Sequence, residues 1–156
     1  MTPRRALAAL ALIFALAHIP FLANSLEDID SVNFALGVRD FNVAEHRPHP
    51  PGYPVYIAMG KVMTAAAGLV MSGAPAAAVE ARALAALSLL AGVIAIVCLY
   101  GAFSSLTSRA PGGPSPWRAI NVEALAATAV TASCPLFWYL AARPMSDLPG
   151  LAFALA

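Results

Sequence analysis

The hydrophobic positions of this chain fall into long runs that are separated by short polar segments. An α-helix needs about 20 consecutive apolar residues to cross the hydrocarbon core of a bilayer. Runs of this kind predict membrane spans at residues 6–23, 53–71, 83–103 and 120–142, with a shorter fifth run from about residue 148. The pattern therefore predicts an all-α, polytopic transmembrane protein.

The two ends of the chain indicate how the protein is oriented in the membrane and whether the chain is a part of a larger protein. Arg4 and Arg5 precede the first apolar run, and the positive-inside bias places them in the cytoplasm and the next loop outside. A cleavable signal peptide is an alternative interpretation, because a basic start, an apolar middle and the small residues Ala15 and Ala17 also fit it. The last run has about half the length that a span requires. We therefore expect a truncated chain, the N-terminal part of a larger membrane protein.

The longest polar segment beside these spans is the external loop at residues 24–52. Ser25, with Asp28 three residues later, predicts a helix start, and apolar side chains in 32–36 recur at helical spacing behind it. We expect a short amphipathic helix on the membrane surface that ends near Arg39. The following run HRPHPPGYP cannot be regular helix, because prolines remove backbone donors and bias the preceding residues toward extended geometry.

Composition limits the classes of function. The chain is 60% hydrophobic and 11% charged, whereas a soluble domain carries roughly 25% charged residues. Its formal net charge of +1 provides no basic excess for neutralising phosphates, so nucleic acid is not an expected partner. The sequence shows no glycine-rich nucleotide loop, nucleophile elbow or CxxC motif, so nucleotide chemistry, serine hydrolysis and thiol exchange have no support.

Asp30 is the leading candidate for chemistry. A carboxylate at the bilayer surface beside apolar helices is partly desolvated and suits a general base. The alternative is that Asp28 and Asp30 simply cap the surface helix through backbone N–H groups. A lone base suits group transfer from an activated donor better than hydrolysis, in which two carboxylates usually divide protonation and attack. Glu45 is a possible second acid, but nothing in the sequence positions it.

His46, His49, Tyr53 and Arg143 are the candidate substrate-binding residues. The histidines could hydrogen-bond a phosphate or a sugar hydroxyl, or belong to an ordinary polar loop. The prolines around them argue against a helical face that presents both to a zinc ion, so we expect no metal site. Arg143 could hold a lipid phosphate bidentately, although we prefer the interpretation that it marks a cytoplasmic flank. Lys61, inside the predicted span 53–71, is expected to line an interior.

Three segments of the loop resemble a known family. DSVNFALG from Asp30, FNV from Phe41 and HPPGYPVY from His49 resemble the first external loop of bacterial GT-C membrane glycosyltransferases related to protein O-mannosyltransferases. The similarity extends more loosely to the ARPMSD segment around Arg143. Members of that family transfer a sugar from a polyprenyl-phosphate carrier, using an acidic residue of this loop that Asp30 matches. Asn33 stands where related sequences often place a second acid.

The resemblance implies a GT-C-like, multi-pass enzyme of the bacterial inner membrane with a cytoplasmic N-terminus. Asp30 would deprotonate an acceptor hydroxyl as the carrier phosphate leaves. The implied partners are membrane lipid, a polyprenyl-phosphate sugar, and a glycan, lipid or protein acceptor; no cofactor beyond this lipid-linked donor is implied, and a divalent metal requirement stays open. The truncated part alone is expected to be inactive. Two other classes remain open: a transporter or flippase component that uses Lys61 and the acidic loop, and a noncatalytic scaffold in which Asp30 is only a cap.

Overall fold

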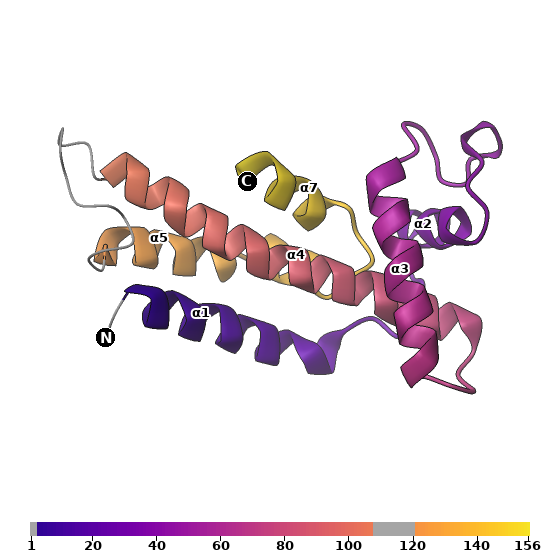
Figure 1. Ribbon diagram of the computed structural model, residues 1–156, viewed down its shortest axis with the longest axis horizontal. Coiled ribbons are helices and arrows are strands. Elements are labelled where there is room, and N and C mark those ends of the chain that lie inside the picture. The colour runs from indigo at the N-terminus through magenta and orange to yellow at the C-terminus, as the bar shows by residue number, and fades with distance from the viewer. Residues whose placement is uncertain (1–2, 108–120) are drawn as a thin grey trace.

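The computed structural model describes residues 3–107 and 121–156, which form a set of helices (Figure 1). In chain order they are α1 Pro3–His18, η1 Ile19–Phe21, α2 Ile29–Arg39, η2 Val43–Glu45, α3 Pro54–Val70, α4 Ala76–Thr107, α5 Val122–Ala132, α6 Pro135–Ala141 and α7 Asp147–Leu155. The predicted all-α class is confirmed for this part of the chain.

Helix α4 is the central element of the fold. Its 32 residues extend over about 48 Å at 1.5 Å per residue, and α1, α5 and α7 lie along it (Figure 1). Gly92 marks a close approach in the middle of α4, because a Cβ there would lie 3.2 Å from Leu148 Cδ1 and 3.3 Å from Phe14 Cε1. Small residues at such contacts let helices pack closely in lipid.

Two stretches are long and apolar enough to cross a membrane, namely Arg4–Phe21 and α4. They cover the predicted spans at 6–23 and 83–103 almost completely. The predicted span at 120–142 begins at a residue outside the described part of the chain and is otherwise divided between α5 and α6, which meet at 66° and count as one further span only if taken together. The break falls at Pro135, the first residue of α6, where proline lacks a backbone donor.

The segment predicted as a span at 53–71 has a different place in the fold. Helix α3 has 17 residues, shorter than the candidate spans, and it lies across the beginning of α4 rather than along it (Figure 1). Gly60 permits the crossing, since a Cβ there would lie 2.8 Å from Leu84 Cδ2 and 3.0 Å from Val38 Cγ2. An apolar run of this length fits either a membrane span or a helix that packs across another helix. Hydrophobic periodicity alone does not distinguish the two arrangements.

Helices α2 and α3, with the loop 40–53 between them, form a unit that we call the cap. Its buried side chains pack against α4 and comprise Phe34, Ala35, Val38, Tyr56, Ile57, Leu84 and Leu87. The cap lies at the end of the bundle where α1 ends, since Arg82 near the start of α4 donates a hydrogen bond to Asn24. Helix α4 ends at the opposite end, where Asn121 Nδ2 donates to Thr107 Oγ1 over 2.5 Å. Both ends of α3 therefore lie at one end of the bundle.

Lys61 lies on an exposed face of α3 and, with Phe41 and Pro54, lines a shallow surface pocket. The expectation that this lysine lines an interior was wrong. The reason is the placement of α3, which packs one side on α4 and leaves the other side uncovered by the described residues.

His18 joins α1 to α6 inside the bundle. Its side chain is fully buried, with Nδ1 2.7 Å from the carbonyl oxygen of Phe14 and Nε2 3.2 Å from that of Trp138. Its ring also lies 4.1 Å from the rings of both residues, centroid to centroid. No sequence pattern singled out this histidine, which stands near the end of an apolar run.

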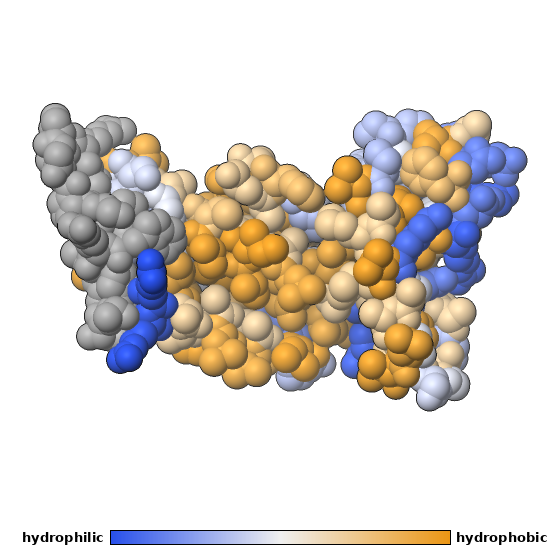
Figure 2. Space-filling view, viewed as in Figure 1, coloured by the Kyte–Doolittle hydropathy of each residue, from blue (hydrophilic) through white to orange (hydrophobic). Residues whose placement is uncertain are grey.

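Apolar side chains cover the middle of the bundle, and hydrophilic ones gather around α2 and the loop after it (Figure 2). Large hydrophobic side chains of α1, α4 and α7 that are more than half exposed include Leu12, Ile13, Leu16, Leu90, Ile94 and Phe153. Contiguous apolar surface of this extent is unusual in soluble monomers. With the candidate spans, it indicates a membrane protein.

Candidate functional site

The N-cap of α2 is Asp28, three residues after Ser25, the helix start that the sequence predicted. Asp28 Oδ1 accepts a hydrogen bond from Ser31 N over 2.7 Å, and Asp28 N donates to Ser31 Oγ over 3.3 Å, which forms a reciprocal capping box. Ser25 Oγ instead donates to Glu27 over 2.8 Å. Aspartate and serine are comparable N-caps, so residue preference alone did not decide between a helix capped by Ser25 and one capped by Asp28.

Because Asp28 caps the helix, the Asp30 carboxylate is left for other contacts. It lies in the first turn of α2, where a negative charge is favoured by the helix dipole. Its side chain is 49% exposed, and its Oδ1 lies 3.9 Å from His49 Nε2. The structure thus assigns capping to Asp28 and places Asp30 beside an imidazole.

An aromatic cluster of Phe34, His49, Tyr53 and Tyr56 holds that imidazole in place. Phe34 is only 2% exposed, and its ring centroid lies 5.9 Å from that of His49, 5.2 Å from that of Tyr53 and 4.7 Å from that of Tyr56. The His49 and Tyr53 rings lie 5.4 Å apart. Phe34 comes from α2, whereas the other rings come from the loop and the start of α3.

The loop that delivers His49 is closed by backbone pairing and by contact with α2. Asn42 and Arg47 exchange two backbone hydrogen bonds of 2.7 and 2.8 Å. Pro48 packs against Gly37, since a Cβ on that glycine would lie 2.7 Å from Pro48 Cδ. As predicted, the segment is not regular helix, and α3 begins at Pro54. The proline run therefore fixes His49 against α2.

Arg143 comes to the same end of the bundle as Asp30. It donates a hydrogen bond to Glu27, and its guanidinium carbon lies 5.2 Å from the centroid of the Tyr139 ring. This pairing lowers the pKa of Glu27 and raises that of Arg143. Nearby, Ala23 N donates to the Ala142 carbonyl over 3.0 Å. The bend between α5 and α6 precedes this segment. The sequence pattern favoured a cytoplasmic flank for Arg143, whereas the structure places it against Glu27 at the cap end of the bundle.

The other candidates lie apart from Asp30. His46 is an exposed loop residue in a left-handed conformation, with a φ of 57°. Glu45 pairs with Arg47 over 2.6 Å, and Arg47 also reaches Asp40 over 2.9 Å. The structure therefore places neither His46 nor Glu45 beside Asp30. Within the described residues, no three His, Cys, Asp or Glu side chains are grouped so as to hold a metal ion.

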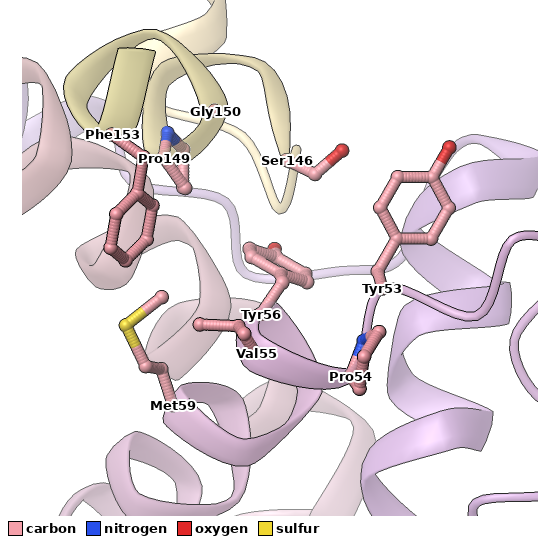
Figure 3. A pocket seen from close by; sticks show the side chains of 9 residues that line it. All are labelled: Tyr53, Pro54, Val55, Tyr56, Met59, Ser146, Pro149, Gly150 and Phe153. Carbon is pink, nitrogen blue, oxygen red and sulfur yellow. The ribbon is translucent and has the colours of Figure 1, made fainter. Parts of the chain in front are cut away.

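A groove descends from the aromatic cluster along α4 and α7. Its upper cavity has a volume of about 240 Å³ and lies between the start of α3 and α7 (Figure 3). It is lined by Tyr53, Pro54, Val55, Tyr56, Met59, Ser146, Pro149, Gly150 and Phe153. Figure 3 shows the Tyr53 and Ser146 hydroxyls at one end and Met59 and Phe153 at the other. The upper cavity is therefore polar at its mouth and apolar below.

A second cavity of about 280 Å³ adjoins the first and shares Met59, Pro149 and Phe153 with it. Its remaining lining is apolar and comprises Leu87, Leu90, Ala91, Ile94, Ala152 and Ala156. Together the two cavities form what we call the groove, which suits a hydrocarbon chain. Sequence reasoning missed Ser146 and Phe153, because their place in the site depends on how α7 packs on α4.

Searches of protein-family models, curated proteins and solved structures each find no match to this chain.

Proposed function

We propose that this chain carries the acidic site of a GT-C-like membrane glycosyltransferase, which moves a sugar from a polyprenyl-phosphate donor to an acceptor hydroxyl. The observation that supports this most is the position of Asp30. It lies beside His49, whose ring contacts Tyr53, and Tyr53 lines the mouth of the apolar groove. A lipid-linked sugar requires this combination, an apolar path for the chain and a base near its headgroup.

In the proposed reaction, Asp30 accepts the proton of the acceptor hydroxyl. The hydroxyl oxygen then forms a bond to the anomeric carbon, while the bond from that carbon to the carrier phosphate oxygen breaks. The bonding electrons leave with the phosphate, which departs as an anion and needs no proton. A single carboxylate is sufficient for such a transfer, and the half-exposed side chain of Asp30 leaves room for the acceptor.

Arg143 is the proposed phosphate partner. Its guanidinium already donates to the Glu27 carboxylate at the cap end of the bundle, and a planar guanidinium can bind a phosphate through two parallel N–H donors. Binding would require Arg143 to exchange Glu27 for the phosphate or to share its donors between them. Because the Glu27 side chain is 56% exposed, its carboxylate is free to be solvated when released.

The orientation of the proposed enzyme rests on its first helix. Arg4 and Arg5 flank the start of α1, so the positive-inside bias puts that end in the cytoplasm and the cap on the external side. Among the basic residues at the cap end, Arg39, Arg47 and Arg143 each pair with a carboxylate, whereas Arg82 donates to Asn24 and Lys61 is exposed. An external cap in the bacterial inner membrane would meet a donor that presents its sugar at the outer surface.

The two other function classes have less support. The transport hypothesis relied on Lys61 as an interior charge, and Lys61 is exposed on the cap. The scaffold hypothesis relied on Asp30 as a helix cap, and Asp28 has that role. These findings favour the transferase among the three.

The test is sugar transfer in vesicles that contain the full-length protein bearing this sequence, with polyprenyl-phosphate mannose as the first donor probe. General bases contribute roughly 100-fold to 10,000-fold, so Asp30→Asn is expected to lower the rate at least about 100-fold without changing helix content. Asp40→Asn is the matched control, because Asp40 is exposed and pairs with Arg47; its rate should stay near that of the unsubstituted protein. Transfer that survives Asp30→Asn would overturn the catalytic role.

A further inference from the structure

The two ring nitrogens of His49 have unequal surroundings, and this carries an inference that rests on the proposed role of Asp30. Nε2 faces Asp30 Oδ1 at 3.9 Å. Nδ1 is buried and has no hydrogen-bond partner among the described residues. One ring nitrogen, Nε2, therefore faces a carboxylate, and the other, Nδ1, lacks a hydrogen-bond partner within the described part of the chain.

The unpartnered nitrogen decides which tautomer fits. A proton on Nδ1 would leave a buried N–H donor without an acceptor, and a doubly protonated ring would do the same. A neutral ring with its proton on Nε2 leaves only a lone pair at Nδ1 and directs its N–H toward Asp30. In this tautomer the donor nitrogen Nε2 faces the Asp30 carboxylate, and the nitrogen without a described partner, Nδ1, carries no proton.

We propose that His49 is a positioning residue: its Nε2–H donates to Asp30 Oδ1 and orients the carboxylate, so that Oδ2 is free to accept the proton of the acceptor hydroxyl. The 3.9 Å separation is longer than a hydrogen bond, and contacts of this kind tighten when substrate binds. The half-exposed Asp30 side chain is the partner expected to move toward this contact, because the His49 ring is held by Phe34 and Tyr53.

This role differs from phosphate binding, which the sequence suggested for His49. An Nε2–H that donates to a carboxylate is not available to a phosphate oxygen, and the carboxylate beside it repels an anion. Asp30 from α2 and Tyr53 from the end of the loop are the titratable groups that the structure places against the ring. Loss of His49 should therefore slow the chemical step and leave donor affinity unchanged.

The first test needs no enzymatic activity. In protein labelled with ¹⁵N in its histidine rings, we expect His49 to show a protonated Nε2 and an unprotonated Nδ1, with resonances assigned through His18→Gln and His46→Gln. Asp30→Asn should shift the Nε2 resonance, and Asp40→Asn should not. A proton on Nδ1, or an Nε2 resonance indifferent to Asp30→Asn, would overturn the inference without bearing on sugar transfer.

The second test uses transfer kinetics. His49→Leu should lower kcat roughly 10-fold with an unchanged KM for the donor, and His49→Gln, which keeps an N–H donor near the Nε2 position, should restore most of the rate. His49→Leu should add little to Asp30→Asn, because the two residues act as a unit. Equal losses in the Leu and Gln variants, or a change in donor KM alone, would contradict positioning.

Together the two tests distinguish a failure of the proposed function from a failure of the positioning role of His49. An Nε2–H tautomer that responds to Asp30→Asn, in a protein that transfers sugar at the same rate with and without that substitution, would retain the contact and reject the proposed function. Transfer that depends on Asp30 but not on His49 would reject the positioning role alone.

Discussion

At the scale of single residues, Asp28 and Asp30 lie two positions apart and have different surroundings. Asp28 has extended backbone dihedrals, a φ of −120° and a ψ of 164°, and its side chain accepts from the backbone. Asp30 lies inside the helix and faces His49. The sequence identified both carboxylates but not their assignment, because capping depends on which residue leaves the helical conformation.

Substitution separates the two aspartates. Asp28→Ala removes the acceptor for Ser31 N and is expected to lower the free energy of unfolding by about 1 kcal/mol. Asp28→Asn keeps an acceptor and should cost less, and Asp30→Ala should also cost less because it removes no cap. Thermal unfolding followed by circular dichroism in detergent measures all three. An Asp30→Ala loss as large as that of Asp28→Ala would contradict the assignment.

The ion pair between Glu27 and Arg143 should make the stability of the protein depend on pH in the acidic range. The hydrogen bond from Arg143 lowers the pKa of Glu27 below its usual 4.5, so folding favours the ionised carboxyl. Its stabilisation is present above pH 4.5 and is lost as the pH falls through the lower pKa of the folded state. Glu27→Gln should remove this part of the acid sensitivity of the melting temperature between pH 6 and pH 3. The effect is small because the pair is exposed, and an unchanged acid profile in Glu27→Gln would contradict it.

At the scale of elements, local chemistry predicted where helices begin and end better than where they lie. Proline at the first turn correctly gave the start of α3, and the end of α2 falls at Arg39 as expected. The crossing of α3 over α4 was not predicted, because it depends on contacts between Gly60 and Leu84, which are distant in the sequence. The apolar run at 120–142 was predicted as one span, whereas the structure bends it by 66° at Pro135.

Gly37 should control how closely the proline loop packs on α2. A Cβ there would lie 2.7 Å from Pro48 Cδ and 3.0 Å from Ile57 Cδ1, so Gly37→Ala is expected to lower the free energy of unfolding by about 1–3 kcal/mol. Gly68→Ala is the control, since no atom lies within 4 Å of the added Cβ and alanine favours a helix by roughly 1 kcal/mol. Thermal unfolding distinguishes them. Equal melting temperatures for the two variants would show that the proline loop moves away from the added methyl group without loss of stability.

The pair between Arg39 and Glu80 should hold the cap on α4. Arg39 makes two 2.6 Å hydrogen bonds to the Glu80 carboxylate, whose side chain is 6% exposed. Arg39→Met leaves that buried charge without its partner and should cost about 1–3 kcal/mol. Arg47→Met, which breaks exposed pairs with Asp40 and Glu45, should cost under about 1 kcal/mol. Chemical denaturation would show the difference, and comparable losses would argue against a special role for Arg39.

At the scale of the whole molecule, the site forms from segments that the sequence recognised singly. Asp30, His49 and Tyr53 were candidates from the loop and do come together. Arg143 follows α6, after the 66° bend between α5 and α6, and lies at the same end of the bundle, where it donates to Glu27. The groove could not be predicted at all, since its walls come from three helices whose packing no local pattern encodes. Sequence thus identified the candidate polar groups, and tertiary packing determined which of them meet.

The arrangement of α3 gives a prediction for membrane sidedness. If α3 crossed the bilayer, the turn after it would lie opposite the loop 40–53. In the structure, Ala44 in the loop 40–53 and Ser72 in the turn after α3 are exposed beside the cap, and Thr107, the last residue of α4, is exposed at the other end of the bundle. Single cysteines are placed at these positions after Cys98 and Cys134, which are free thiols, have been changed to alanine.

A membrane-impermeant maleimide added to intact cells should label Ala44→Cys and Ser72→Cys alike, because the cap is proposed to be external. Thr107→Cys should be labelled only after the membrane is permeabilised, since α4 separates it from the cap by more than the roughly 30 Å hydrocarbon core. Labelling of Ala44→Cys together with Thr107→Cys, with Ser72→Cys labelled only after permeabilisation, would restore α3 as a span. Labelling of Thr107→Cys alone in intact cells would keep the fold and reverse its orientation, which would place Asp30 on the cytoplasmic side and remove the proposed access to an external donor.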